Sequence, residues 1–295
     1  MKKYLFFLLL PFLSIAQTPT SPEVTNWENR AKQVTVTEDN WGIPHIYGKK
    51  DADAVFGLMY VQCQQNFAQV EKNYLEIMGR LSEIEGERRL YDDLQMRLIY
   101  DSAAAKTDYI KSPQWFKNLL DAFSDGVNFY LYKHPETKPL ALKRFEPWFP
   151  LMYTDGSIAP TQTGGLNLQD LRNFYEGKDE ATSFIKPEFS VTNFNPGGSN
   201  GFAIAPSRTA SKNAILYINP HVTFYFRTEV HLVSEEGLNA YGAVTWGQFF
   251  IYQGFNETCG WMHTSSYADV ADVYEEKVEK VADNYGYTYD GDKAR

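Results

Sequence analysis

Residues 196–205 read Pro-Gly-Gly-Ser-Asn-Gly-Phe-Ala-Ile-Ala, and they divide the chain into two halves of different character. Before this stretch, apolar residues recur at helical spacing, whereas after it they form short runs typical of strands. The pattern predicts an α+β fold with a boundary between residues 198 and 199. With 43% hydrophobic and 16% aromatic residues, the chain can bury a substantial core.

The predicted elements follow from hydrophobic spacing and from the proline and glycine residues that interrupt it. Before residue 198 they are a hairpin over 33–47, a helix over 51–81 with Asp51 as its N-cap, a helix that starts with Ser112-Pro113 and ends near 133, and a stretch of loops, short helices and linker over 146–198. After residue 198 they are strands at Phe202–Ala205, Ala214–Ile218, Glu229–Val233, Phe249–Tyr252 and Tyr285–Tyr289.

Residues 1–16 have the features of an export signal. Two lysines precede an apolar run over 4–15, and Ser14-Ile15-Ala16 is a small-x-small cleavage site. The run is shorter than the roughly 20 residues of a membrane-spanning helix. We therefore expect a periplasmic or secreted protein that begins at Gln17 and has no membrane anchor.

Charge and cysteine content narrow the choice of partners. The formal net charge is −9, and loss of Lys2 and Lys3 would make it more negative. An excess of acidic residues argues against nucleic acid and anionic membranes as partners. With only Cys63 and Cys259, the chain has neither a disulfide scaffold nor a zinc cluster. We expect two isolated buried thiols, with a single bridge as the alternative.

Ser199 lies in a sequence that fits two kinds of nucleophile. Residues 197–201 match the G-x-S-x-G turn of α/β-hydrolases, but that turn needs a strand before the serine and a helix after it. Here a proline and two glycines precede the serine, and strand-like residues follow it. Asp269 and Asp272 also follow the last histidine, His263, whereas that fold needs the order serine, acid, histidine.

The second kind is a serine that acts as a new N-terminus, after the bond between residues 198 and 199 is broken. A free α-amino group has a reference pKa near ~7.7–8, which suits a general base at neutral pH. One residue then supplies both nucleophile and base. Small residues before the serine fit this mechanism, because its hydroxyl must attack the preceding carbonyl. Taken alone, the motif is also that of an ordinary turn.

Five motifs follow one another along the second half of the chain. They are Gly198-Ser199-Asn200, Asn219-Pro220-His221, Gly254-Phe255-Asn256, Trp261-Met262-His263-Thr264 and Asp269-Val270-Ala271-Asp272-Val273-Tyr274. In this order and spacing they resemble the penicillin acylase family of N-terminal-nucleophile hydrolases. Residues 39–46, 56–61 and 79–83 look like the family's opening strand and first long helix.

The resemblance implies an αββα sandwich of two stacked sheets flanked by helices, of which this chain is the N-terminal part. It also implies a precursor that is cut into an α-chain and a β-chain, which stay together as a heterodimer. The expected regions are a signal peptide (1–16), a mainly helical α-chain (17–180, ending between 165 and 190), a linker or spacer (181–198) and the start of the β-chain (199–295).

The same resemblance assigns catalytic roles. Ser199 would be the nucleophile, freed by self-cleavage after Gly198. His221 would orient or polarise the Ser199 amine and hydroxyl, since family members acting on lactone, lipopeptide and cephalosporin substrates carry histidine at this spacing. The backbone N–H of Ser265 would donate to the oxyanion of the tetrahedral intermediate.

A pocket and a metal site are implied as well. Val222 and Phe224 would line an apolar acyl pocket. Asp269, Asp272 and the carbonyl of Ala271 would bind calcium, which prefers hard oxygen ligands. Two solvated loop acids are the alternative at this place. No organic cofactor is implied.

The expected function is hydrolysis of an N-acyl amide to a carboxylic acid and an amine. His221 places acyl-homoserine lactones and lipopeptides ahead of penicillin-like substrates. Two alternatives stay open, a Ser-His-Asp esterase and a secreted binding module that keeps the scaffold without turnover. This chain alone is expected to be incomplete as an enzyme, because family members supply a downstream asparagine to the oxyanion site.

Overall fold

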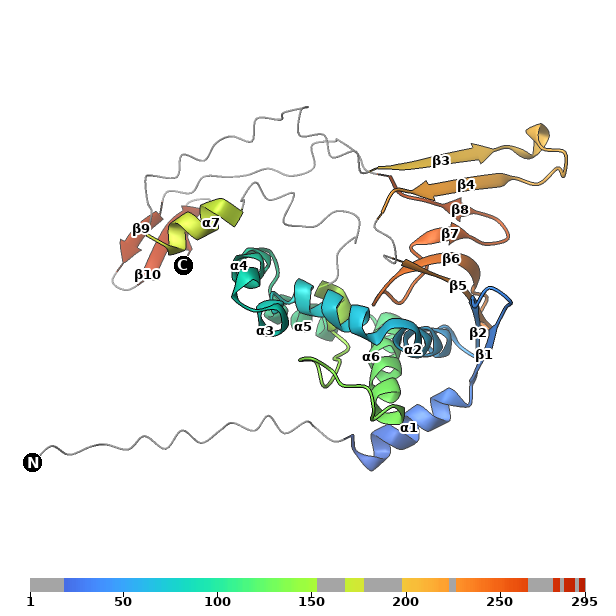
Figure 1. Cartoon of the computed structure of the whole chain (residues 1–295), viewed down its shortest axis with the longest axis horizontal. Coiled ribbons are helices and arrows are strands. Elements are labelled where there is room, and N and C mark those ends of the chain that lie inside the picture. Colours follow the sequence, from blue (N-terminus) through green and yellow to red (C-terminus); the bar gives the residue numbers. More distant parts are fainter. Residues whose placement is uncertain are drawn as a thin grey trace, which may run out of the picture.

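The structure, a computed structural model, combines a helical part with a sheet and is α+β, as expected (Figure 1). It describes residues 19–152, 168–177, 198–222 and 227–264, and the backbone of 278–281, 284–289 and 292–294. The predicted signal segment 1–16 lies outside the described residues. So does all of the predicted spacer 181–198 except Gly198.

The helical part is dominated by α2 and α6, which pack along one another. Their backbones approach so closely that a Cβ on Gly126 of α6 would lie 2.5 Å from the Phe56 carbonyl oxygen of α2. The helices are α1 (Ser21–Ala31), α2 (Asp51–Ile77), α3 (Ser82–Glu85), α4 (Leu90–Ile99), α5 (Ser102–Lys111), α6 (Gln114–Lys133) and α7 (Leu168–Tyr175).

Both long helices were predicted, but α2 begins one residue earlier than expected and α6 one residue later. Lys50 rather than Asp51 is the N-cap of α2, and the Asp53 carboxylate accepts a hydrogen bond from the Lys50 N–H. Pro113 is likewise the N-cap of α6, because its ψ of 153° is extended rather than helical. Helix α1 was missed, although Thr20 and Glu23 form a capping box in front of it.

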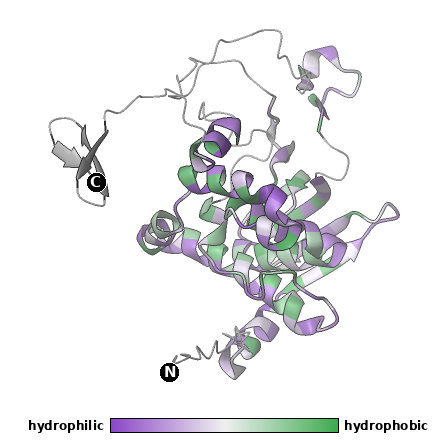
Figure 2. Ribbon diagram, turned by 60° about the vertical axis from the view of Figure 1, so that its left-hand side comes forward, coloured by the Kyte–Doolittle hydropathy of each residue, from purple (hydrophilic) through white to green (hydrophobic). Residues whose placement is uncertain are grey.

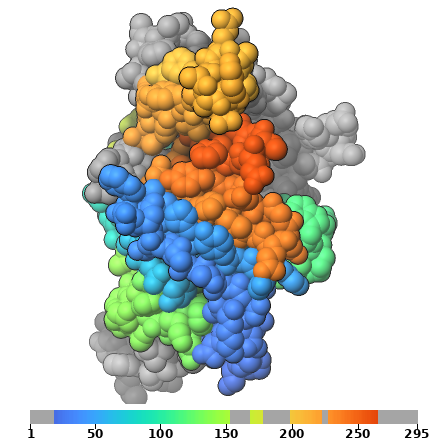
Figure 3. Space-filling view, turned by 90° about the vertical axis from the view of Figure 1, so that its right-hand side faces the viewer, coloured from blue at the N-terminus to red at the C-terminus, as the bar shows by residue number. Residues whose placement is uncertain are grey.

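The main sheet has six strands in the order β1-β2-β5-β6-β7-β8. They are β1 (Val34–Glu38), β2 (Pro44–Gly48), β5 (Arg227–Ser234), β6 (Asn239–Thr245), β7 (Gln253–Phe255) and β8 (Gly260–Trp261). β2 and β5 are parallel, and the other neighbours are antiparallel. The sheet is therefore built from both sides of the predicted cleavage point, as the contact between blue and orange segments in Figure 3 shows.

A histidine pair spans the join between β2 and β5. His45 and His231 are aligned in the parallel register, and their Nδ1 atoms lie 2.9 Å apart. The second ring nitrogen of His231 contacts the Asn239 side chain at 2.9 Å. Side chains as well as backbone thus connect the segments that precede and follow residue 198.

The strand predictions were mostly confirmed. The hairpin β1–β2, the strand β5 and the strands β3 (Ser199–Ile204), β4 (Ile215–Pro220) and β10 (Asn284–Tyr289) lie where the sequence predicted. The strand expected at Phe249–Tyr252 was wrong, because these residues form a loop before β7. Phe249, Ile251 and Tyr252 are buried there, and a continuous apolar run cannot distinguish a buried loop from a buried strand.

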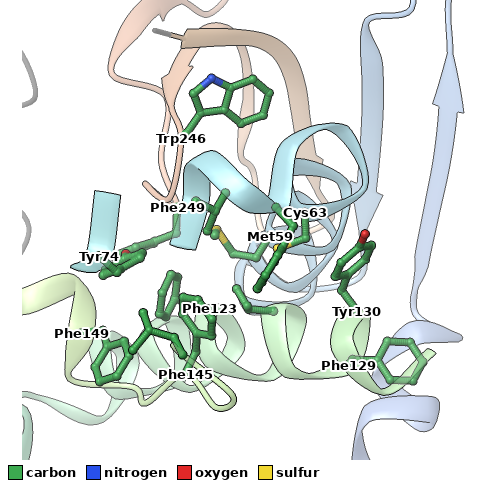
Figure 4. Packing of buried hydrophobic residues seen from close by; sticks show 14 of the residues in the cluster. Met59, Cys63, Tyr74, Phe123, Phe129, Tyr130, Phe145, Phe149, Trp246 and Phe249 are labelled. Atoms are coloured by element: carbon green, nitrogen blue, oxygen red, sulfur yellow. The ribbon is translucent and has the colours of Figure 1, made fainter. Parts of the chain in front are cut away.

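The core lies on both sides of α2. One cluster joins α2 to α6 and the chain after it, and includes Tyr74, Phe123 and Phe145 (Figure 4). A second cluster joins α2 to the sheet through Leu58, Val230 and other residues. Hydrophobic residues accordingly gather where helices and sheet meet (Figure 2).

The two cysteines differ in environment, which corrects one expectation. Both are free, but only Cys63 is buried, whereas Cys259 is exposed in the turn before β8. Burial raises the pKa of the Cys63 thiol. The Cys259 thiol instead donates to the side-chain oxygen Oδ1 of Asn256, which also accepts from the Cys259 backbone N–H.

Gln62 of α2 binds the turn between β6 and β7. Its amide nitrogen donates to the Gln248 carbonyl oxygen at 2.7 Å, and its oxygen accepts from the Gly247 N–H at 2.8 Å. Gln62→Leu should lower the free energy of unfolding by about 2–5 kcal/mol, because it leaves two buried backbone groups unpaired. Urea denaturation measures this. Gln64→Leu, at an exposed position of the same helix, should change stability by less than about 0.5 kcal/mol.

Candidate active site

Ser199 is the first residue of β3, which pairs with β4 in an antiparallel hairpin separate from the main sheet. A serine that opens a strand does not have the strand-turn-helix geometry of the α/β-hydrolase nucleophile. In Figure 1 the hairpin lies beside β8. There the Leu216 side chain of β4 fills the space that a side chain on Gly260 would need.

The hairpin register places His221 beside the predicted scissile bond. The His221 backbone N–H donates to the Gly198 carbonyl oxygen at 2.9 Å. Residues 198 and 221 thus form a hydrogen-bonded pair, so the next pair, Ser199 with Pro220, is not hydrogen-bonded. The N–H and C=O of Ser199 therefore face away from β4, and Pro220 costs the ladder no donor.

The His221 imidazole lies between two asparagine side chains. Its Nε2 is 3.4 Å from the Asn200 Nδ2 and 3.3 Å from the Asn219 Nδ2. These three side chains share one face of the hairpin, because alternate residues of a strand point the same way. Ser199 belongs to the opposite set. In the uncut chain, the described contacts thus link His221 to Gly198 through its backbone.

The segment after β8 reaches Ser199 from its other side. The Thr264 hydroxyl donates to the Ser199 carbonyl oxygen at 2.8 Å. Two residues earlier, Met262 packs on the backbone of β3, where a Cβ on Gly201 would lie 1.7 Å from the Met262 Sδ. Position 201 therefore requires glycine for this approach, and residues 262–264 follow the start of β3 closely.

The same segment is attached to the main sheet. The buried Gln253 of β7 donates from its amide nitrogen to the His263 carbonyl oxygen at 3.0 Å. Its amide oxygen accepts a 2.7 Å hydrogen bond from the Arg227 guanidinium. The His263 ring lies against Tyr252, with 4.4 Å between ring centroids. Hydrogen bonding and stacking thus connect the sheet, through residues 262–264, to Ser199.

Of the other predicted site residues, the structure describes only Val222. Val222 follows His221 directly and is 38% exposed. The remaining predictions, at Phe224, Ser265, Asp269, Ala271 and Asp272, lie outside the described residues. Within the ranges that are described, no group of three or more acidic, histidine or cysteine side chains could hold a metal ion.

Three contacting residues had no role in the sequence prediction. Asn200, Asn219 and Thr264 belong to the quoted motifs, but their contacts depend on the strand register and on the path of the chain after β8. Alternation along β4 could have placed Asn219 on the same face as His221. No local signal indicates that Thr264 meets Ser199, since 65 residues separate them.

The site is open to solvent in the described structure. Asn200, His221, His263 and Thr264 are exposed, and Ser199 is half-buried. None of the described helices has the length and apolar character needed to cross a membrane.

Comparison with known proteins agrees with the motif pattern. A family model described as penicillin amidase matches residues 33–295. The acyl-homoserine lactone acylase QuiP of Pseudomonas fluorescens is 23% identical over 92% of this chain and 39% of its own length. The penicillin acylase 2 proenzyme of Pseudomonas sp. is 26% identical over 83% of this chain and 38% of its own. A thermostable penicillin G acylase from Alcaligenes faecalis aligns at 19% identity over 40% of this chain and 68% of its own, with a TM-score of 0.37.

The chain spans about two fifths of the length of the curated relatives that it matches. The family match runs through Ser199, His221 and Thr264, the residues that the hairpin and the segment after β8 bring together. Since the match covers nearly the whole chain, the chain belongs to the penicillin amidase family.

Proposed function

We propose that this protein hydrolyses N-acyl amides with Ser199 as an N-terminal nucleophile, exposed when the precursor cuts its own Gly198–Ser199 bond. Membership of the penicillin amidase family supports the reaction type. The observation that carries the self-cleavage proposal is the 2.9 Å hydrogen bond from the His221 N–H to the Gly198 carbonyl oxygen. This donor is aimed at the oxygen that gains negative charge when the carbonyl is attacked.

The cleavage is an N-to-O acyl shift followed by hydrolysis. The Ser199 hydroxyl oxygen adds to the Gly198 carbonyl carbon, and the C–N bond of the peptide then breaks. The Ser199 nitrogen takes up the proton that the hydroxyl loses, which leaves an ester between Gly198 and Ser199. Water hydrolyses the ester to a Gly198 carboxylate, a free Ser199 hydroxyl and a free amine.

Turnover of a substrate also transfers an acyl group to the Ser199 hydroxyl, and water then hydrolyses the resulting ester. The Ser199 amine accepts the hydroxyl proton while the oxygen attacks the acyl carbon of the substrate. The substrate amine then leaves with that proton, and water releases the acid from the acyl-enzyme. The Ser265 N–H would stabilise the oxyanion, and His221 would orient the Ser199 amine.

Acyl-homoserine lactones and lipopeptides are the proposed substrates ahead of penicillins. The basis is His221, together with relatives whose names include acyl-homoserine lactone acylase and penicillin acylase. Val222 and Phe224 would line the acyl pocket. The esterase alternative is not favoured, because Ser199 opens a strand. A binding module without turnover is the alternative that activity assays would test.

The finer architecture belongs to the same proposal. We expect an αββα sandwich, completed by the rest of the protein, and an α/β heterodimer after cleavage. The shared sheet supports the heterodimer, because β1 and β2 precede Ser199 while β5 to β8 follow it. Residues 1–16 would direct export to the periplasm or the medium and would then be removed.

Self-cleavage predicts two chains and a defined new N-terminus. The full-length precursor should yield a β-chain that begins Ser-Asn-Gly-Phe-Ala, as measured by intact mass. Ser199→Ala should remain one inactive chain, whereas Ser199→Cys should still be cut, because a thiol performs the same shift. An active single chain, or a β-chain with another first residue, would reject this mechanism. Activity is measured with acyl-homoserine lactones of several chain lengths and penicillin G.

His221→Ala separates cleavage from turnover. The substitution keeps the backbone N–H that faces Gly198, so self-cleavage should continue. Loss of the imidazole should lower turnover by about 100-fold, the lower limit for a group that assists proton transfer. The two rates are measured by mass spectrometry and by release of the amine. Cleavage lost together with turnover would contradict a backbone role in cleavage.

A calcium ion at Asp269, Ala271 and Asp272 would stabilise the fold without taking part in chemistry. Treatment with EDTA should then lower the melting temperature, and calcium should restore it more fully than magnesium. Asp272→Asn should reduce this dependence. An unchanged melting temperature after EDTA would mean that these acids hold no structural ion.

A further inference from the structure

Ser199 lies one residue beyond a hydrogen-bonded pair of the β3–β4 hairpin. Residue 200 pairs with 219 within the ladder, whereas the backbone groups of Ser199 face away from β4. In the uncut chain, residue 199 is also held through its neighbour, because the Gly198 carbonyl accepts from the His221 N–H. Cleavage after Gly198 removes that attachment and makes Ser199 a chain end. Chain ends fray unless another contact ties them down.

Thr264 supplies such a contact. Its hydroxyl donates to the Ser199 carbonyl oxygen at 2.8 Å, on the side away from β4. This hydrogen bond involves the backbone of residue 199 itself, so breaking the bond to Gly198 does not remove it.

Thr264 is itself held in place. Met262 packs against the backbone at Gly201, and the His263 carbonyl accepts from the buried Gln253 of β7. The His263 ring also lies against Tyr252. The hydroxyl is thus carried by a segment fixed to β3 at one point and to the main sheet at another.

We propose that Thr264 is a positioning residue that holds the Ser199 nucleophile after self-cleavage, an inference that rests on the proposed function. Without its hydroxyl, the new N-terminal residue keeps its chemistry but loses its fixed backbone orientation. Thr264 also directly precedes Ser265, the predicted oxyanion donor. A single hydrogen bond thereby ties the nucleophile to the segment that carries this donor, and errors in such alignment slow catalysis.

The test compares Thr264→Val with Thr264→Ser in the full-length protein. Thr264→Val should still cut itself, within about threefold of the wild-type rate, because the contact between His221 and Gly198 is intact. Its kcat should then fall by about 10–100-fold with little change in KM. Thr264→Ser, which keeps the hydroxyl, should stay within about threefold of wild type. Thr258→Val, the same change in the turn before β8, is the control and should have no effect.

A second measurement does not depend on the substrate. The rate at which a sulfonyl fluoride labels Ser199 should fall in cleaved Thr264→Val and recover in Thr264→Ser, while the number of labelled sites per molecule stays at one. Fewer labelled sites that react at the wild-type rate would indicate partial unfolding and overturn the proposal.

Three further results would overturn the positioning role. The first is an unchanged kcat and labelling rate in Thr264→Val, and the second is a rise in KM alone in that variant. The third is a loss of kcat in Thr264→Ser equal to that in Thr264→Val. A wild-type precursor that never cuts itself would instead reject the proposed function, and with it the basis of this inference.

Discussion

The packing of α2 between two sets of partners is the constraint on which the rest of the structure depends. One face of this helix meets α6, and another meets the sheet, so residues such as Leu58 and Tyr74 belong to different buried clusters. Its polar residues Gln62 and Tyr74 bind the backbone of the turn between β6 and β7. The sheet is thus fixed by a helix that precedes the predicted cut.

A short series of contacts connects helix α2 to the candidate site. The turn held by α2 leads into β7, whose Gln253 fixes the segment around His263. This segment meets β3 at Ser199 and Gly201. The hairpin β3–β4 is a two-stranded sheet, which without these contacts would be only marginally stable. Ser199 therefore owes its orientation to the buried core, although it lies at an open surface.

Sequence patterns predicted the parts of the fold that depend on neighbouring residues. The spacing of Val70 and Tyr74 identified α2, and alternation identified the first hairpin. The parallel pairing of β2 with β5 joins residues 186 apart, and no local pattern specifies such a register. The motifs located Ser199 and His221 along the chain. The contact of His221 with Gly198 through its backbone emerges only once β3 and β4 are aligned.

The parallel join between β2 and β5 also bears on the order of assembly. Before the proposed cut, these strands belong to one chain, and their pairing is an intramolecular event at a high effective concentration. Afterwards they belong to two chains, so a denatured mature protein could recover its sheet only by a second-order encounter. Refolding of the cut protein would then depend on protein concentration, whereas refolding of the uncut precursor would not, so unfolding would be harder to reverse after the cut than before it.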